Sequence, residues 1–293
     1  MHSMEGKGNM LKLSYNTNGL REISVLQAIS ELKKAGYDGI ELALEETQFN
    51  PFHLSGDDLK KINESLESNK LYGACIATGS ARLLSKEAYE PSLIHPTQSG
   101  RNQRIDLLKR SLEIAHALNI PVVNFASGKL TAGLEPERAT EFLVEGIEKL
   151  LHESDSIILA IEPEPEFFIG TSAEAVSLIK NINNTRFRLN LDIGHVYCCE
   201  DNFFEAVEHS IPYAVHMHIE DIADRVHRHL IPGDGEIDFE RVFSVIMDNA
   251  YEGYISVELY HHADQWQEAI TESHQRLIRL MDLKQGKDVQ FAG

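Results

Sequence analysis

The chain has 293 residues, 42% of them hydrophobic, which is enough apolar surface for the core of one long α/β unit. Its formal net charge of -19, from 46 acidic and 27 basic residues, disfavours nucleic acids and anionic membranes as partners, because both are polyanionic. No apolar run approaches the roughly 18–20 residues that are needed to span a bilayer.

The cysteine content and the N-terminus both indicate a cytoplasmic protein. Three cysteines, Cys75, Cys198 and Cys199, are too few for a disulfide framework, and the adjacent pair is poorly placed to form a bridge. The first ten residues, MHSMEGKGNM, lack the apolar centre of a secretory signal. We expect residues 1–9 to be disordered or to derive from an expression tag.

Apolar runs and amphipathic stretches alternate along the chain. In order, the runs predict strands at 10–16, 37–44, 71–79, 120–128, 157–163, 187–195, 213–221 and 253–259. The amphipathic stretches predict helices at 22–36, 55–70, 101–119, 134–154, 171–183, 202–210, 238–251 and 263–281. Gly36 is a stop signal, Ser55 and Asp238 are caps, and Pro136 lies in a first turn.

Eight strands that alternate with eight helices predict a parallel α/β fold. The strands read as nearly continuous apolar runs, which is typical of parallel strands covered on both faces. No glycine-rich phosphate loop follows the first strand, which argues against a doubly wound sheet. Because we find no linker, low-complexity tract or break in composition, we interpret residues 1–293 as a single (β/α)8 TIM barrel domain.

The segment 81–100, after the third predicted strand, is the least regular part of the chain. In a barrel, this position belongs to the loops that contact the substrate, so one interpretation is a lid. A solvated connection is an equally good interpretation.

The last four predicted strands end in side chains that can bind a metal. They carry Glu162, Asp192, His218 and Glu258 in turn. Because the carboxyl ends of barrel strands meet at one mouth, these side chains can surround one point. Between Asp192 and His195, we expect Gly194 to allow a sharp turn.

Three carboxylates and one imidazole form a mixed oxygen and nitrogen ligand set. Such a set suits manganese, zinc, cobalt or iron, and it suits magnesium less well because of the histidine. The ion would act as a Lewis acid on a substrate oxygen, and a carboxylate could exchange a proton at the neighbouring carbon. For each glutamate alone, a buried pair with Arg or Lys is the alternative.

The runs IEP, LDIGH, HMHIED and SVEL, in this order, together with GIEL and PGDGEIDF, resemble the xylose isomerase-like TIM-barrel superfamily. Within it, the chain looks most similar to sugar epimerases of the tagatose/psicose 3-epimerase kind and to their sugar phosphate isomerase relatives. The resemblance implies an acid–base pair, Glu162 and Glu258, on the two faces of an enediolate. It also implies that His195 contacts substrate hydroxyls and that the metal ligands are Glu162, Asp192, His218 (rather than His216) and Glu258.

The chain departs from these epimerases six residues after the fifth-strand ligand. The epimerases carry a substrate-binding glutamate at this position, whereas this chain has Phe168. The difference puts a ketohexose substrate in question.

The run HIEDIADRVHRHLIPGDGEI (218–237) is similar to a segment of endonuclease IV, in the same superfamily, that supplies extra zinc ligands. This similarity implies a second metal site at His195, His227 and His229, but the three histidines could instead form a substrate clamp. The endonuclease histidines on the third and fourth strands are absent, so we do not expect a three-metal cluster. Nearby, Arg225 could bind a phosphate or carboxylate of the substrate.

We therefore predict a divalent-metal-dependent sugar isomerase or epimerase that moves a proton next to a carbonyl. The alternatives are a metal-dependent lyase, dehydratase or phosphodiesterase-like hydrolase of the same superfamily, and a sugar-binding barrel without catalysis. The predicted partner is a small carbohydrate-like molecule, with no nucleic acid and no membrane. The sequence leaves open the substrate, the natural metal, the number of ions and whether the protein is a homo-oligomer.

Overall fold

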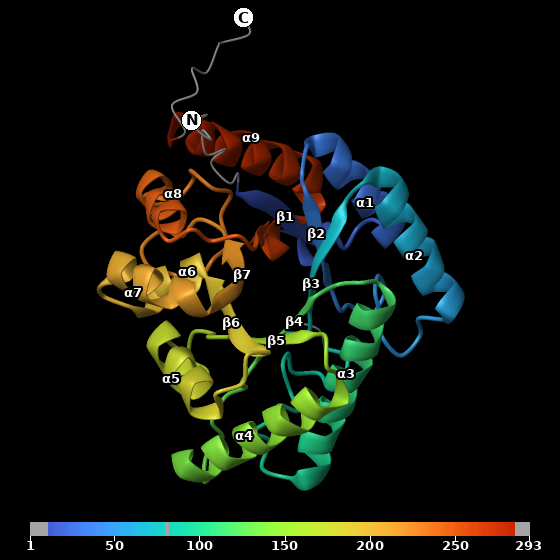
Figure 1. Ribbon diagram of the computed structural model, residues 1–293, viewed down its shortest axis with the longest axis vertical. Helices are drawn as coiled ribbons and strands as arrows, with labels where there is room; N and C mark the ends of the chain where they lie inside the picture. Colours follow the sequence, from blue (N-terminus) through green and yellow to red (C-terminus); the bar gives the residue numbers. More distant parts are fainter. Residues whose placement is uncertain (1–10, 80–81, 285–293) are drawn as a thin grey trace, which may run out of the picture.

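The predicted strands close into a barrel. The computed structural model describes residues 11–79 and 82–284, and within them each strand pairs in parallel with the next while β8 pairs with β1 (Figure 1). The helices surround this ring. The (β/α)8 TIM barrel predicted from the sequence is confirmed, and the expectation for residues 1–9 lies outside the described residues.

The strands are β1 (Lys12–Asn16), β2 (Gly39–Ala43), β3 (Tyr72–Ala77), β4 (Val122–Ala126), β5 (Ile158–Glu162), β6 (Phe187–Asp192), β7 (Ala214–Ile219) and β8 (Tyr254–Val257). The helices are α1 (Val25–Ala35), α2 (Gly56–Asn69), α3 (Gln98–Ala117), α4 (Pro136–Glu153), α5 (Ser172–Ile182), α6 (Ile193–Cys199), α7 (Phe203–Ser210), α8 (Phe239–Asp248) and α9 (Trp266–Lys284). Within the described ranges, none of these helices has the length and apolar character that crossing a membrane requires.

Local capping explains where several helices begin and end. Ser55 and Thr171 each accept a backbone N–H three residues further on, and an acidic side chain returns the bond, which makes a capping box. Asp238 caps α8 in the predicted way. Gly36 ends α1 at a φ of 102°, in the left-handed region that glycine adopts without strain.

The segment after β6 differs from the sequence prediction. We expected a sharp turn at Gly194, but α6 begins directly after the strand, so this prediction was wrong. The reason is that Asp192 Oδ1 accepts the backbone N–H of His195 at 2.8 Å and caps the helix. Gly194 is needed for packing instead, because a Cβ atom there would lie 1.8 Å from Glu220 Oε1.

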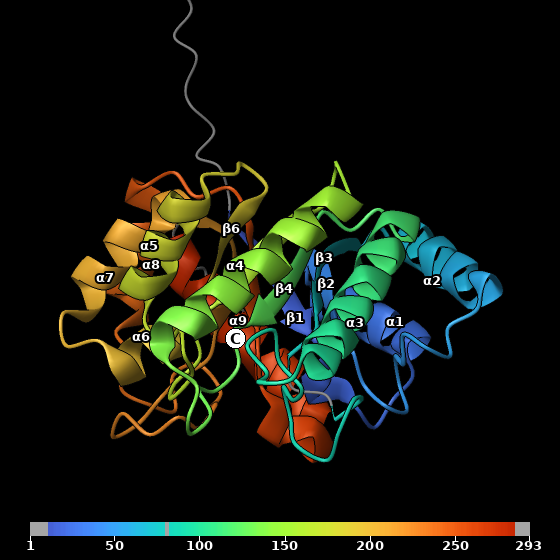
Figure 2. The same ribbon diagram turned by 90° about the horizontal axis from the view of Figure 1, so that it is seen from below.

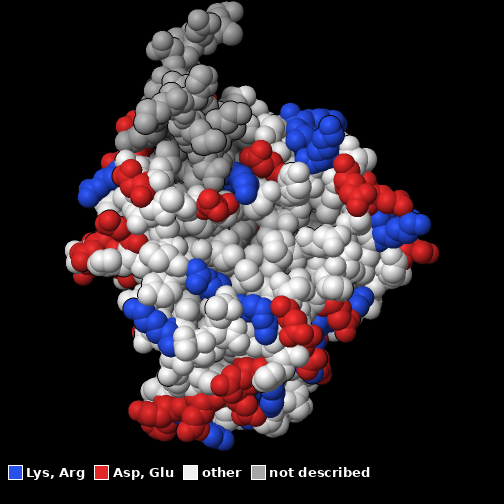
Figure 3. Space-filling model, viewed as in Figure 1, with Lys and Arg blue, Asp and Glu red and all other residues white. Residues whose placement is uncertain are grey.

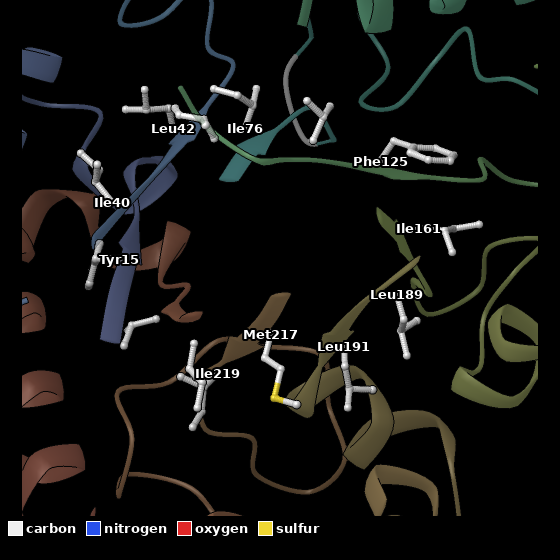
Figure 4. Close-up of a cluster of buried hydrophobic side chains, with 14 of the residues drawn as sticks. Tyr15, Ile40, Leu42, Ile76, Phe125, Ile161, Leu189, Leu191, Met217 and Ile219 are labelled. Carbon is white, nitrogen blue, oxygen red and sulfur yellow. The ribbon is translucent and has the colours of Figure 1, made fainter. Parts of the chain in front are cut away.

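Successive residues of each strand point alternately out of the barrel and into it. The outward-facing residues are apolar and form the main core, which lies between the strands and the helices. Figure 4 shows members of this core around the ring of strands, among them Ile40, Phe125, Leu189 and Met217. The burial of this outward set holds the helices against the barrel.

The inward-facing residues are mostly polar. This differs from the expectation, because the strands were predicted as nearly continuous apolar runs. A small apolar cluster of Cys75, Val122 and Ala160 is separate from the main core. The oxygens of Ser14 and Ser256 lie 2.6 Å apart in a buried hydrogen bond. Because buried polar groups need partners, the barrel interior becomes a hydrogen-bonded network rather than a second apolar core.

The segment between β3 and α3 is irregular where it is described, as predicted, and α3 begins at Gln98. It lies at the same end of the barrel as the other strand-to-helix segments (Figure 2). Its use as a lid stays a prediction. On the face that Figure 3 shows, acidic and basic side chains are interspersed around the periphery, so the net charge of -19 does not form one uniform acidic surface there.

Candidate metal centre

Four side chains from the ends of β5 to β8 meet at the mouth of the barrel. One ligand atom from each of Glu162, Asp192, His218 and Glu258 lies within 4.8 Å of the others. The strand register explains this meeting, because Asp192 on β6 pairs with His218 on β7. The structure therefore brings together the four ligands that the sequence suggested.

Each of the three carboxylates has one oxygen held by a protein donor. Glu162 Oε2 accepts from Asn124 Nδ2 at 3.2 Å, and Glu258 Oε1 accepts from Asn16 at 3.0 Å and from Asn18 at 2.7 Å. Asp192 Oδ1 accepts the N–H that starts α6. These donors fix the orientation of the carboxylates and leave the second oxygen of each for another partner.

The second oxygens face His218. Its Nδ1 lies 2.8 Å from Glu162 Oε1, 3.5 Å from Glu258 Oε2 and 3.7 Å from Asp192 Oδ2. Glu162 Oε1 and Asp192 Oδ2 are buried and have no hydrogen-bond partner. Three carboxylate oxygens and one ring nitrogen that converge in this way form a ligand set that suits a divalent cation, which these four side chains would hold.

The other ring nitrogen of His218 is held by Glu41, a residue that the sequence analysis did not assign to the site. His218 Nε2 lies 3.0 Å from both carboxylate oxygens of Glu41, and His216 Nε2 lies 3.1 Å from Oε2. All three side chains are buried. A hydrogen bond from Nε2–H to Glu41 leaves the lone pair of Nδ1 for a metal, which is how supporting carboxylates orient histidine ligands.

In the absence of a cation, two of the four ligands retain protons. Burial opposes a charge on His218, but nearby carboxylates, Glu41 foremost, hold its pKa well above the usual value. Burial raises the pKa of Glu258 to about 8. Burial also opposes ionisation of Asp192, yet nearby histidines, His195 foremost, hold its pKa well below the usual value.

Three other histidines converge on a second point. Nε2 of His195 and Nε2 of His229 each lie 2.9 Å from Nε2 of His227. His195 Nδ1 lies 2.9 Å from the carbonyl oxygen of Pro163, and His229 Nδ1 lies 2.8 Å from that of Glu258, so both rings donate Nδ1–H to the backbone. The predicted trio is therefore together, with its Nε2 atoms directed at one another.

The three Nε2 atoms make two close contacts, but of the three histidines His195 alone has a raised pKa. Burial opposes a charge on His195, but Asp192 and Glu164 outweigh it and raise its pKa to about 9. Burial and then His195 lower the pKa of His227 to about 4, and burial holds that of His229 well below its usual value. If His195 donates to His227, Nε2 of His227 and Nε2 of His229 lie 2.9 Å apart without a proton between them.

A cavity of about 580 Å³ opens over both clusters. Besides the predicted residues, it is lined by Glu164, Tyr89 and Tyr260, which the sequence analysis missed. Burial raises the pKa of Glu164 to about 7, and the Tyr89 hydroxyl donates to its Oε2 at 3.3 Å. The signal for Glu164 was present in the repeated glutamates of IEPEPE, two residues beyond Glu162.

Arg225 does not line this cavity. Its guanidinium lies 3.3 Å from the carbonyl oxygen of Glu200 and over the ring of Tyr197, so the structure gives no support to the predicted role in substrate binding. The cationic side chains that do line the cavity are Arg21 and Arg82.

Phe168 also lies outside the lining of the cavity. Its ring packs against the main core, and its backbone N–H donates to the carbonyl oxygen of Gly128 at 2.9 Å.

A family model described as xylose isomerase-like TIM barrel matches residues 29–280. The chain belongs to this family. It is 24% identical over 243 residues to L-ribulose-5-phosphate 3-epimerase UlaE of Escherichia coli, a match that covers 80% of this chain and 82% of that protein. These findings confirm the predicted xylose isomerase-like superfamily.

Solved structures agree on the fold. D-psicose 3-epimerase from Clostridium cellulolyticum, solved with D-tagatose, matches with a TM-score of 0.76 at 15% identity, over 92% of this chain and 99% of that one. A family 2 AP endonuclease from Brucella melitensis matches with a TM-score of 0.71 at 23% identity, over 86% and 93% of the two chains.

The substitution Glu41→Gln tests the support of His218. The amide oxygen can still accept from Nε2–H, but the negative charge that strengthens His218 as a ligand is lost. We expect the affinity for a divalent metal to fall by about 10–100-fold, as measured by competition with a chromophoric chelator on the apoprotein. The exposed Glu22→Gln is the matched control. Equal affinities in the two variants would show that Glu41 does not support the ligand.

Metal binding should release protons. Because the pKa of Glu258 is raised to about 8 and that of His218 is also raised, protons compete with the metal at neutral pH. The affinity should therefore rise from about pH 6 to about pH 9. Calorimetry in two buffers of different ionisation enthalpy measures the released protons directly. An affinity that does not change with pH, without proton release, would contradict this account.

Proposed function

We propose that the protein is a divalent-metal-dependent sugar isomerase or epimerase. The proposal is supported by one observation above all: oxygens of Glu162, Asp192 and Glu258 converge on His218, beside a cavity that Glu162 and Glu258 line. Family membership gives this ligand set its chemical context. The named relatives act on sugars, so a sugar or sugar phosphate is the proposed class of substrate.

When bound, a manganese, zinc, cobalt or iron ion would polarise a carbonyl or hydroxyl oxygen of the substrate, with magnesium less suited to the histidine ligand. Proton transfer belongs to Glu162 and Glu258. They come from β5 and β8, three strands apart in the ring, and both line the cavity. One carboxylate takes the proton from the carbon next to the carbonyl, and the other returns a proton to the substrate.

The remaining polar side chains of the cavity orient the substrate. Glu164 lines it beside the ligands, and the Tyr89 hydroxyl donates to its Oε2 at 3.3 Å. A carboxylate and a phenol at this spacing can hold neighbouring hydroxyl groups of a sugar. Tyr260 adds a hydroxyl from the segment after β8.

The variants Glu162→Gln and Glu258→Gln test the proton transfers. Each should lower turnover by about 10²–10⁴-fold, because a general acid–base group is lost while the shape of the side chain is kept. The assay follows incorporation of solvent deuterium into a panel of ketoses and aldoses, and metal content is measured alongside. Full exchange in a variant that retains its metal would remove that residue from the mechanism. Water addition or bond cleavage without exchange would favour a hydrolase or lyase instead.

We propose further that His195, His227 and His229 hold a second divalent ion. The observation that favours an ion over a substrate clamp is the pair of 2.9 Å contacts that bring the three Nε2 atoms together, while Nδ1 of His195 and of His229 is already bound to a backbone carbonyl. Three neutral imidazoles are a common ligand set for zinc.

The number of bound ions tests this second site. Elemental analysis should give two ions per chain for the wild-type protein and one for His227→Ala, because the four-ligand centre is intact in that variant. Asp192→Ala provides the complementary measurement, since it removes a ligand of the first centre. One ion per chain in both the wild-type protein and His227→Ala would contradict the second metal site and would favour a substrate clamp at the three histidines.

A further inference from the structure

A second cavity adjoins the one over the metal ligands. It has a volume of about 890 Å³ and is lined by the segments that follow β3, β4 and β5 and by the first turns of α3. Ala88 and Tyr89 line both cavities, so a single stretch of the β3–α3 segment separates them. We refer to the cavity over the ligands as the inner chamber and to the larger one as the outer chamber.

Tyr89 connects the two chambers through both ends of its side chain. Its hydroxyl donates to Glu164 Oε2 in the inner chamber, at 3.3 Å. Its ring meets the ring of Phe167, which lines the outer chamber, edge-on at a centroid distance of 4.9 Å. Gly79 makes room for this position, because a Cβ there would lie 2.6 Å from Tyr89 Cε1. A molecule that reaches Glu164 from the outer chamber must pass this tyrosine.

The charges of the outer chamber do not suit a phosphate group. Lys86 and Lys129 line it, but so do Glu87 and Glu90. In addition, Lys129 Nζ pairs with Glu166 Oε2 at 2.9 Å. His95 and the first turn of α3, at Ser99 and Gly100, also line it, but the partial positive charge of a helix N-terminus is smaller than the charge of the two glutamates.

The shape and chemistry of the outer chamber suit an uncharged ring with hydroxyl groups. The aromatic faces of Phe167 and Tyr89 provide apolar surface, and Thr97, Ser99 and Gln103 provide side chains that can hydrogen-bond. Its volume lies within the roughly 300–1,000 Å³ that ligand pockets usually have, and one phosphate would leave most of it empty.

We propose that the outer chamber binds a second sugar ring, joined glycosidically to the sugar that reacts in the inner chamber. This inference rests on the proposed function and narrows its substrate class to glycosyl sugars, in place of free monosaccharides and sugar phosphates. Chemistry at the metal centre is unchanged: one C–H bond breaks and one re-forms at the carbon next to the carbonyl, and the glycosidic bond stays intact. Phe167 and Gln103 then determine specificity without touching the reacting carbon.

The test compares one ketose with its own derivatives on the metal-loaded protein. The probes are D-fructose, four of its glucosyl derivatives (turanose, maltulose, leucrose and palatinose) and D-fructose 6-phosphate. Deuterium incorporation from solvent gives kcat/KM for each compound. We expect at least one glucosyl derivative to exceed D-fructose by about 10-fold or more, because the second ring adds contacts in the outer chamber. Equal values for all six compounds, or a preference for the phosphate, would overturn the inference.

Two variants connect this preference with the outer chamber. Phe167→Ala and Gln103→Ala should each bring the ratio of kcat/KM values, glucosyl derivative over D-fructose, closer to one. The matched control is Phe52→Ala, an exposed phenylalanine that lines neither chamber, and it should keep the wild-type ratio. A wild-type ratio in both Phe167→Ala and Gln103→Ala would overturn the assignment of the second ring to this chamber.

Failure of the proposed function can be told apart from failure of this inference. If none of these compounds and no sugar of the wider ketose and aldose panel exchanges a proton, the proposed function fails. The inference is then tested by binding alone. Saturation-transfer NMR with the same compounds then reports which protons contact the protein. Contacts from the glucosyl ring that disappear in Phe167→Ala support the outer chamber, and their absence from the wild-type protein overturns it.

Discussion

The candidate centre depends on how the barrel interior satisfies its polar groups. Each site carboxylate has two oxygens, and a protein donor holds one of them: Asn124 for Glu162, the N–H that starts α6 for Asp192, and two asparagines for Glu258. The other oxygens of Glu162 and Asp192 lie 2.8 and 3.7 Å from His218 Nδ1. Without a cation, the raised pKa values of His218 and Glu258 keep protons among these carboxylates, and a bound cation would take the place of those protons. The asparagines orient the ligands in advance, so little reordering is needed when a cation binds.

The sequence predicted the barrel because its signals are local. Eight apolar runs of strand length, separated by capped amphipathic helices, leave few alternatives to a closed parallel barrel. The same locality explains the success at Ser55 and Asp238, whose caps depend on residues three positions away. It also explains the failure at Gly194, where a glycine suggested a turn but Asp192 caps a helix. The packing against Glu220 that requires this glycine is not visible in the local sequence.

The four-residue ligand set could be suggested from the ends of consecutive strands, but its support could not. Glu41 lies on β2 and reaches His218 on β7 across the barrel, a contact between residues 177 positions apart. Glu41 is the charged residue in the otherwise apolar strand GIELA, but the local sequence does not show which side chain it supports. Arg225 was assigned to the site because it lies close to His227 in the sequence, but the two residues do not line the same cavity. The backbone at Arg225 has a φ of 54°, and the side chain contacts Glu200 instead.

The two candidate centres share side chains, so neither can change its charge without affecting the other. His195 Nε2 lies 3.5 Å from Asp192 Oδ2, and His229 Nδ1 lies 3.6 Å from Glu258 Oε2. A cation at the four-ligand centre would neutralise part of the negative charge of Asp192, which is the main interaction that raises the pKa of His195. His195 would then lose its proton more readily, and its Nε2 lone pair would become available to the histidine trio. Occupation of the first centre should therefore lower the pKa of His195 and release a proton from the histidine trio.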